Sequence, residues 1–141
     1  MIGDRGKSNE SLGKLLSSAR DGCFAECGDT ESELNLQRRS LLNLEARTRA
    51  NDSSIRYLAT YDSIMRLVEI WLLQFGYRLG RHPHQGMIAT ATLLAPRIQR
   101  DEVRALVDAR HRLKKDGVRP AEDLQQLLCD LHLQLQEQVI P

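Results

Sequence analysis

The longest clear element of the sequence begins at Asp52 or Ser53 and ends near Gly76. After Tyr61 its apolar residues cover most of a helical circumference, a pattern that indicates a helix buried on more than one side. Gly76 provides the stop, because glycine tolerates the left-handed conformation that ends many helices. We therefore expect this segment to form the central column of a helical bundle. Its apolar residues are Ile55, Leu58, Ala59, Met65, Leu67, Val68, Ile70, Leu72, Leu73 and Phe75.

The rest of the chain also reads as helices separated by glycine, proline and polar breaks. Leucines at helical spacing predict a short helix over 11–25 and a second helix from Thr30, with a capping box to Glu33. Another helix runs from His84 to Ala95, and Pro120 lies near the first position of a final one. No strand signal or internal repeat is evident, so the sequence predicts an all-α, up-and-down bundle of five to six helices. The final helix is expected to bury Leu124, Leu127, Leu128, Leu131, Leu133 and Leu135.

The segment Arg100–Gly117 predicts a helix with an apolar side and a cationic side. Arg104 and His111 are seven residues apart, about two turns, and therefore share a face. Asp116-Gly117 supplies the stop. A histidine among arginines can bind or cleave a phosphodiester, or it can belong to a merely solvated helix face. The candidate catalytic residues are Arg104, Arg110 and His111, and the candidates for binding a nucleic acid or nucleotide are Arg78, Arg81, His82, His84, Lys114 and Lys115.

The charges are unevenly distributed along the chain, although the formal net charge is only +1. Arg97–Arg119 carries eight cations against four acids, whereas the segment from Pro120 to the end carries four acids and no lysine or arginine. Two explanations are open: neighbouring helices pair these charges, or the basic segment forms a surface for phosphates.

Length and composition indicate one globular domain, since 141 residues with 41% hydrophobic and 28% charged residues can bury a core. We expect a loose polar end over 1–10 and a single helical domain over 11–141. The apolar run Ile64–Phe75 is too short to cross a bilayer and contains two charges. The first residues contain no apolar core of a signal peptide. A cytoplasmic protein without a membrane partner is the expectation.

No motif for a metal or a cofactor is present. Cys23 and Cys27 are four residues apart, which on a helix would place two thiols on one face. Zinc needs about four ligands, and no second pair has suitable spacing. Cys129 is expected in the core and His132 at its boundary. Glycine-rich phosphate loops, nucleophile elbows and paired catalytic carboxylates are also absent, so we expect no metal and no cofactor.

Three stretches resemble the HEPN domain family, small helical bundles of prokaryotic toxin–antitoxin and defence systems. SSIRYLATYDSIMRLVEIWLLQFGYR resembles the family's long helix, with its tyrosine-aspartate pair at Tyr61-Asp62 and its glycine-tyrosine at Gly76-Tyr77. RHPHQGM resembles the histidine-containing start of the next helix, and LVDARHRLKKDG resembles the signature helix. The resemblance covers Ser53–Gly117 and is loose over the first fifty residues.

This resemblance implies a chemistry and a set of partners. Active members of the family are metal-independent ribonucleases, in which an arginine stabilises the phosphate and a histidine acts as acid and base at the ribose 2′-hydroxyl. Two subunits commonly pair so that both signature helices face one cleft, and a nucleotidyltransferase is a frequent companion. A homodimer that binds RNA, a nucleotide or a nucleotidyltransferase partner is therefore expected from the resemblance.

The signature departs from the family pattern at the histidine. Counted from Arg110, the position five residues later is Lys115, and lysine is a poor general acid or base unless its pKa is strongly lowered. Counted from Arg104, the histidine is His111, but Ala105 then occupies the polar position. We expect an eroded active site on a basic, RNA-binding cleft. The alternatives are an active ribonuclease toxin that uses Arg104 or Arg110 with His111, and a purely structural interaction bundle.

Overall fold

The protein is an all-α helical bundle with one small two-stranded sheet, which confirms the predicted fold class. The computed structural model describes residues 12–16 and 22–140, so the predicted loose end over 1–10 lies outside the described residues. Residues 12–16 are helical. No helix in the described part is both long and apolar enough to cross a membrane. The elements are β1 (Phe24–Glu26), α2 (Thr30–Glu45), the 3-10 helix η1 (Arg47–Arg49), α3 (Ser53–Leu73), β2 (Tyr77–Leu79), α4 (Pro83–Leu94), α5 (Arg100–Asp116) and α6 (Glu122–Val139).

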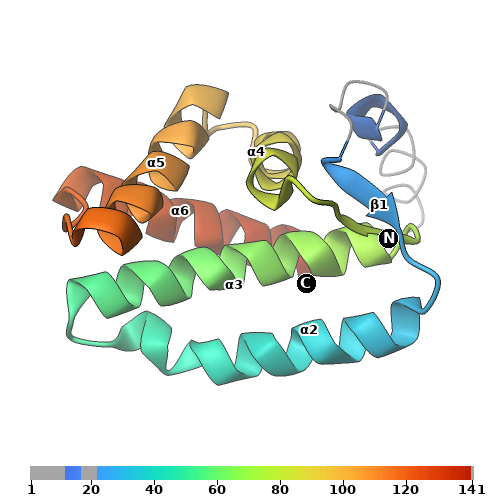
Figure 1. Ribbon diagram of the computed structural model, residues 1–141, viewed down its shortest axis with the longest axis horizontal. Coiled ribbons are helices and arrows are strands. Elements are labelled where there is room, and N and C mark those ends of the chain that lie inside the picture. The colour runs from blue at the N-terminus through green and yellow to red at the C-terminus, as the bar shows by residue number, and fades with distance from the viewer. Residues whose placement is uncertain (1–11, 17–21, 141) are drawn as a thin grey trace.

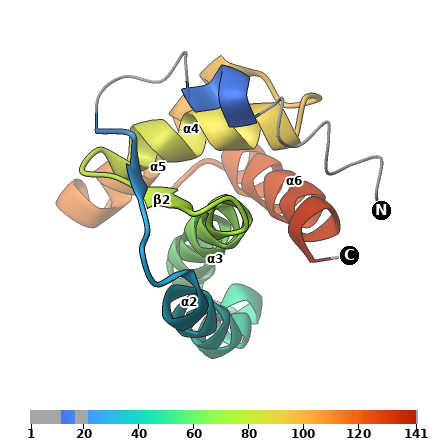
Figure 2. The ribbon, with the colours of Figure 1, turned by 90° about the vertical axis from the view of Figure 1, so that its right-hand side faces the viewer.

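Helix α3 is the central column, as its apolar pattern predicts. Helix α2 lies along one side of it, and α4, α5 and α6 cover the other (Figures 1 and 2). The side chains of Leu67 and Leu72 are completely buried, as expected for a helix enclosed on several sides. Asp52 is the N-cap and accepts hydrogen bonds from the backbone N–H groups of Ser54 and Ile55. These contacts fix the start of α3 at the predicted position.

Helix α5 is attached to this column by its apolar side and by one buried hydrogen bond. Val103 and Leu106 are completely buried. The Tyr57 hydroxyl of α3 donates a hydrogen bond of 2.7 Å to the carbonyl oxygen of Leu106. The helix ends at Gly117, whose φ of 68° is the left-handed conformation expected from the Asp116-Gly117 stop. The rotational position of α5, and so of its charged residues, is therefore fixed.

Helix α6 buries three of the predicted leucines completely, and one prediction on it is wrong. Leu128, Leu131 and Leu135 lie in the core, whereas Leu133 is 57% exposed. Leu133 is two positions from both Leu131 and Leu135, which places it on the opposite side of a 3.6-residue helix. The helix begins at Glu122, with Pro120 two residues before it, close to the predicted position.

The two short strands were not predicted. β1 pairs antiparallel with β2, with Phe24 opposite Leu79, so the helix expected over 11–25 is wrong from Phe24 onward. Three residues are too few for an alternating pattern, and the partner strand lies more than fifty residues away. Gly80 permits the close approach, because a Cβ there would collide with the Gly22 carbonyl.

Helix α2 differs from the other helices in its shallow burial. Its N-cap is Asp29, which accepts from the Ser32 N–H, and not the predicted Thr30. Within α2 only Gln37 is buried, while Leu42 is 68% exposed. The predicted leucine stripe is therefore only partly used for packing.

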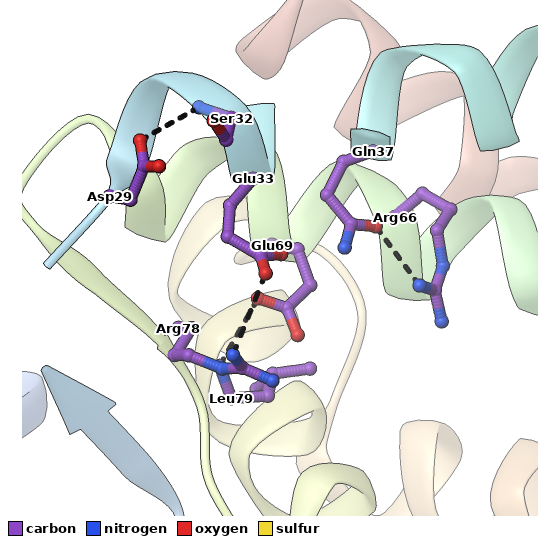
Figure 3. Close-up of polar contacts among 8 residues, drawn as sticks. All are labelled: Asp29, Ser32, Glu33, Gln37, Arg66, Glu69, Arg78 and Leu79. Carbon is purple, nitrogen blue, oxygen red and sulfur yellow. Dashed lines mark hydrogen bonds and ion pairs between the residues drawn. The ribbon is translucent and has the colours of Figure 1, made fainter. Parts of the chain in front are cut away.

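Polar contacts join α2 and β2 to α3 (Figure 3). The buried Gln37 side chain accepts a hydrogen bond of 3.0 Å from the Arg66 guanidinium. The Glu69 carboxylate accepts one of 3.2 Å from the Leu79 N–H of β2. Burial raises the pKa of Glu69, while the Leu79 N–H and two nearby arginines oppose that shift. On this side of the column, hydrogen bonds add to the packing of the partly buried Leu34 and Leu41 against the core.

Candidate functional site

Arg110 is the cation of α5 that lies against α3. It lies close to the buried side of the helix, near Leu106 and Leu113 on the helical wheel, and its side chain is only 20% exposed. The guanidinium carbon lies 4.9 Å from the ring centre of Tyr61, a cation–π distance. The nearest carboxylate is Asp62, with 4.0 Å between Nη2 and Oδ1.

His84, from the first turn of α4, contacts the hydroxyl end of Tyr61. Its Nδ1 is 2.8 Å from the Tyr61 hydroxyl, and the two rings are tilted with centres 5.8 Å apart. One tyrosine thus contacts a guanidinium with its ring and an imidazole with its hydroxyl. We refer to Tyr61, Asp62, His84 and Arg110, which come from α3, α4 and α5, as the Arg110 cluster.

The surroundings of the cluster keep His84 neutral. Burial lowers the pKa of His84, and the positive charge of Arg110 lowers it further, while Asp62 acts in the opposite direction. Lys114 and His111 also lower the pKa of His84, so both lie within electrostatic range of it. Burial raises the pKa of the Tyr61 hydroxyl well above its usual range, so this group keeps its proton.

The Arg110 guanidinium has donors that the protein does not use. Its Nε is buried and has no hydrogen-bond partner among the described residues. The 4.0 Å separation from Asp62 is too long for a hydrogen bond, and Asp62 itself is 45% exposed. A guanidinium carries five N–H donors in a fork that matches two oxygens of a phosphate. The cluster can therefore accept an anion without first breaking a strong internal ion pair.

The other candidates on α5 lie on its outer side. Arg104 and His111 share an exposed face, as their spacing predicts. Together with their neighbours they form what we call the basic stripe, which falls within about 100° of the helix circumference. Its exposed residues are Arg100, Arg104, His111, Lys114 and Lys115. The structure brings His111 and Lys114 near His84, and leaves Arg104 pointing away from the bundle.

Three predicted binding residues lie elsewhere. Arg78 is 3.7 Å from Glu33 of α2, on the side of α3 shown in Figure 3. Arg81 and His82 lie against Gly22, where an added Cβ would meet both side chains. None of the contacts described for these three residues involves the Arg110 cluster. Of the predicted binding residues between Arg78 and His84, the cluster includes His84 alone.

Sequence reasoning missed the part that Tyr61 and Asp62 play in this site. Tyr61 is completely buried. The sequence signal for this role was the resemblance to the family's long helix, which includes the Tyr61-Asp62 pair. Spacing within α5 could not reveal the site, because the histidine that meets Arg110 comes from α4.

The opposite charges of α5 and α6 do not pair with each other. In the described part of the chain, Arg110 is the only α5 cation with an ion pair, and its acid is Asp62 of α3. The acids of α6 make local contacts instead, as when Asp130 accepts from Gln126. Of the two explanations of the charge distribution, pairing between these two helices is therefore wrong.

The cysteines form no ligand set. Cys23 and Cys27 flank β1 and do not share a helix face, and the buried Cys23 thiol lies 4.0 Å from the Gln85 side-chain oxygen. Cys129 is only partly buried. No group of three histidine, cysteine or acidic side chains gathers at one point in residues 12–16 and 22–140.

Comparisons with protein-family models, curated proteins and solved structures gave no match. The likeness to the HEPN family thus depends on the residues of Ser53–Gly117 alone. The cluster, by contrast, is defined by geometry, and its chemistry can be argued without a relative.

Proposed function

We propose that this protein is a HEPN-like RNA-binding protein of toxin–antitoxin or defence type, which holds an RNA phosphate at the Arg110 cluster and does not cleave it. The observation that carries the proposal is the Arg110 guanidinium, held over Tyr61 beside His84, with its side chain 20% exposed and its nearest carboxylate 4.0 Å away. Such a preorganised donor set suits the oxygens of a phosphodiester.

The basic stripe supports a polyanion as the ligand. It follows one side of α5, a helix of 17 residues and about 25 Å, from Arg100 to Lys115. No ion pair within the described residues neutralises these lysines and arginines. An RNA strand lying along α5 would therefore meet several unpaired cations and the Arg110 cluster together. This electrostatic contribution predicts an affinity that falls with salt.

An active ribonuclease is the second candidate, because an imidazole lies beside the guanidinium. His84 would take the part that the resemblance gives to a histidine on the signature helix. Binding without cleavage is preferred since Lys115 stands at the expected histidine position, and since a histidine held neutral and hydrogen-bonded is a weak proton donor.

The test of RNA binding compares two arginines of the same helix. Arg110→Gln removes the guanidinium and keeps a long polar side chain over Tyr61. Arg112→Gln removes the same charge where Asp108 and Asp116, four residues away on each side, already balance it. Fluorescence anisotropy with a labelled single-stranded RNA should give at least a tenfold loss of affinity, about 1.4 kcal/mol, for Arg110→Gln. Arg112→Gln should stay within about twofold.

Equal effects of the two substitutions, or no association at low salt, would end the proposal. Thermal unfolding of both variants checks that each is folded. The same RNA incubated with a metal chelator tests the second candidate. Intact RNA supports binding alone, whereas cleavage that disappears in both Arg110→Gln and His84→Gln establishes the ribonuclease.

The proposal also includes partners. The resemblance supports a homodimer and a nucleotidyltransferase partner. Light scattering coupled to gel filtration measures the oligomeric state. Expression with and without the neighbouring genes, scoring growth and RNA integrity together, tests the toxin–antitoxin role.

A further inference from the structure

We infer that Tyr61 is a positioning residue that fixes His84 in the neutral tautomer with its proton on Nε2, so that the site offers phosphate a neutral N–H donor beside the Arg110 guanidinium. The inference deepens the proposed function and, for its phosphate part, rests on it. It assigns the ring nitrogen of His84 that carries the proton, which neither the resemblance nor the proposed function specifies.

The first step is the hydrogen bond between Tyr61 and His84. Tyr61 is completely buried, and among the described residues Nδ1 of His84 is the only hydrogen-bond partner of its hydroxyl. A buried hydroxyl proton without an acceptor costs about 1–3 kcal/mol. The O–H therefore donates to Nδ1. A neutral imidazole that accepts at Nδ1 carries its proton on Nε2.

The second step is the set of charges around His84. From α5 it faces Arg110, His111 and Lys114, and from α3 it faces Asp62 and the Tyr61 hydroxyl. The two permanent cations oppose a further positive charge, and one half-exposed carboxylate does not balance them.

The third step follows from reversing the hydrogen bond. An imidazolium would place a proton on Nδ1, and the Tyr61 oxygen would have to accept it. The hydroxyl proton would then have no acceptor in the described surroundings. Burial lowers the pKa of His84 in agreement with this geometry. The positive charge beside His84 thus comes from Arg110 and Lys114, and the contribution of His84 to RNA affinity should change little as pH falls through about 6.5, where an ordinary histidine becomes charged.

Nuclear magnetic resonance of the histidine ring nitrogens tests the tautomer directly, without RNA. In the wild type, His84 should show an acceptor-type Nδ1 and a protonated Nε2. Tyr61→Phe fills the same space and removes the hydroxyl. It should give His84 a mixed tautomer and a higher apparent pKa.

Binding profiles across pH test the consequence for phosphate. The wild-type profile should parallel that of His84→Gln through pH 6.5, whereas Tyr61→Phe should gain several-fold in RNA affinity over both at acid pH compared with neutral pH. His84→Gln, whose amide retains a neutral N–H donor, should keep most of the affinity at neutral pH. His84→Leu should lose several-fold.

The outcomes separate the inference from the proposed function. A proton on Nδ1 in the wild type, or an unchanged His84 in a folded Tyr61→Phe, overturns the inference whatever RNA does. The wild-type spectrum decides the tautomer even if Tyr61→Phe does not fold. The expected tautomer in a protein that binds no RNA supports the positioning role, and overturns the phosphate part together with the proposed function.

Discussion

At the scale of single residues, Tyr61 links stability to the candidate chemistry. Its ring fills the core below Arg110, and its hydroxyl holds His84. Tyr57, four residues earlier, holds α5 by donating a hydrogen bond to the carbonyl oxygen of Leu106. Two tyrosines on adjacent turns of α3 thus position the helices that supply the guanidinium and the imidazole. Large substitutions at either position would disturb packing and site together, which is why the tests above use Tyr61→Phe.

The glycine that ends α5 gives a prediction free of packing effects. Gly117 has a φ of 68°, and a Cβ there would meet nothing within 4 Å. Gly117→Ala should therefore lower the free energy of unfolding by about 1 kcal/mol, the cost of the left-handed conformation alone. Gly28 is equally open and has no positive φ, so Gly28→Ala is the matched control and should be nearly neutral. Urea unfolding compares them, and equal values would contradict the explanation.

His132 gives a prediction about pH. Its Nε2 is buried without a partner among the described residues, and burial lowers its pKa. Below about pH 6.5 the unfolded chain takes up a proton that the folded chain refuses, so stability is lost as pH falls through the lowered folded value. His84 acts in the same direction.

His132→Leu should remove this contribution and raise the free energy of unfolding by about 1 kcal/mol, with the larger gain near pH 5. His82→Gln, at an exposed position without a side-chain capping bond, is the control for replacement of a surface histidine and should change the free energy of unfolding by less than about 0.5 kcal/mol. Urea unfolding at neutral pH and near pH 5 measures the free energy of unfolding of each variant relative to the wild type. A gain that is independent of pH would show that packing, and not protonation, is responsible.

At the scale of elements, the two sides of α3 are held differently. Helices α4, α5 and α6 share an apolar core with it, whereas α2 adds the partly buried Leu34 and Leu41 to that core and has Gln37 as its one buried residue. The Arg66–Gln37 hydrogen bond is therefore a large part of what orients α2, because breaking it leaves a buried amide unsatisfied.

Arg66→Ala should cost about 1–3 kcal/mol of stability, as expected when a buried polar group loses its partner. The control is Arg49→Ala, which breaks the ion pair with Glu45 on the surface, where both side chains are more than half exposed. That change should be close to neutral. Thermal unfolding ranks the two variants, and a larger loss for Arg49→Ala would contradict the assigned roles.

The sequence predicted the helices well and the site only in part, for physical reasons that differ. The α3 column and the Gly117 stop follow from periodicity and local backbone preference, which are properties of short segments. The β1–β2 pair and the Tyr61–His84–Arg110 contact join segments far apart in the chain, and spacing carries no information about such contacts. Leu133 shows the intermediate case, where composition suggested burial but helical geometry places the side chain outside.

At the scale of the whole molecule, the unequal burial of α2 and α3 predicts that the two helices open with different free energies. Thirteen residues of α3 are buried, compared with one residue of α2. Segments with few buried apolar contacts open with less free energy than the global core. Helix α2, on the outer side of the column (Figure 2), should therefore unfold locally while α3, α5 and α6 remain folded.

Hydrogen exchange followed by mass spectrometry measures this difference. Peptides from 30–45 should exchange much faster than peptides from 57–73, and the α5 peptides should resemble those of α3, since Tyr57 ties the two helices together. Arg66→Ala should accelerate exchange in α2 and leave α5 unchanged, because the broken hydrogen bond joins α3 to Gln37 of α2 and not to α5. Uniform exchange across α2 and α3 would mean that the polar contacts of α2 unfold only with the core, and would place both sides of α3 in one cooperative unit.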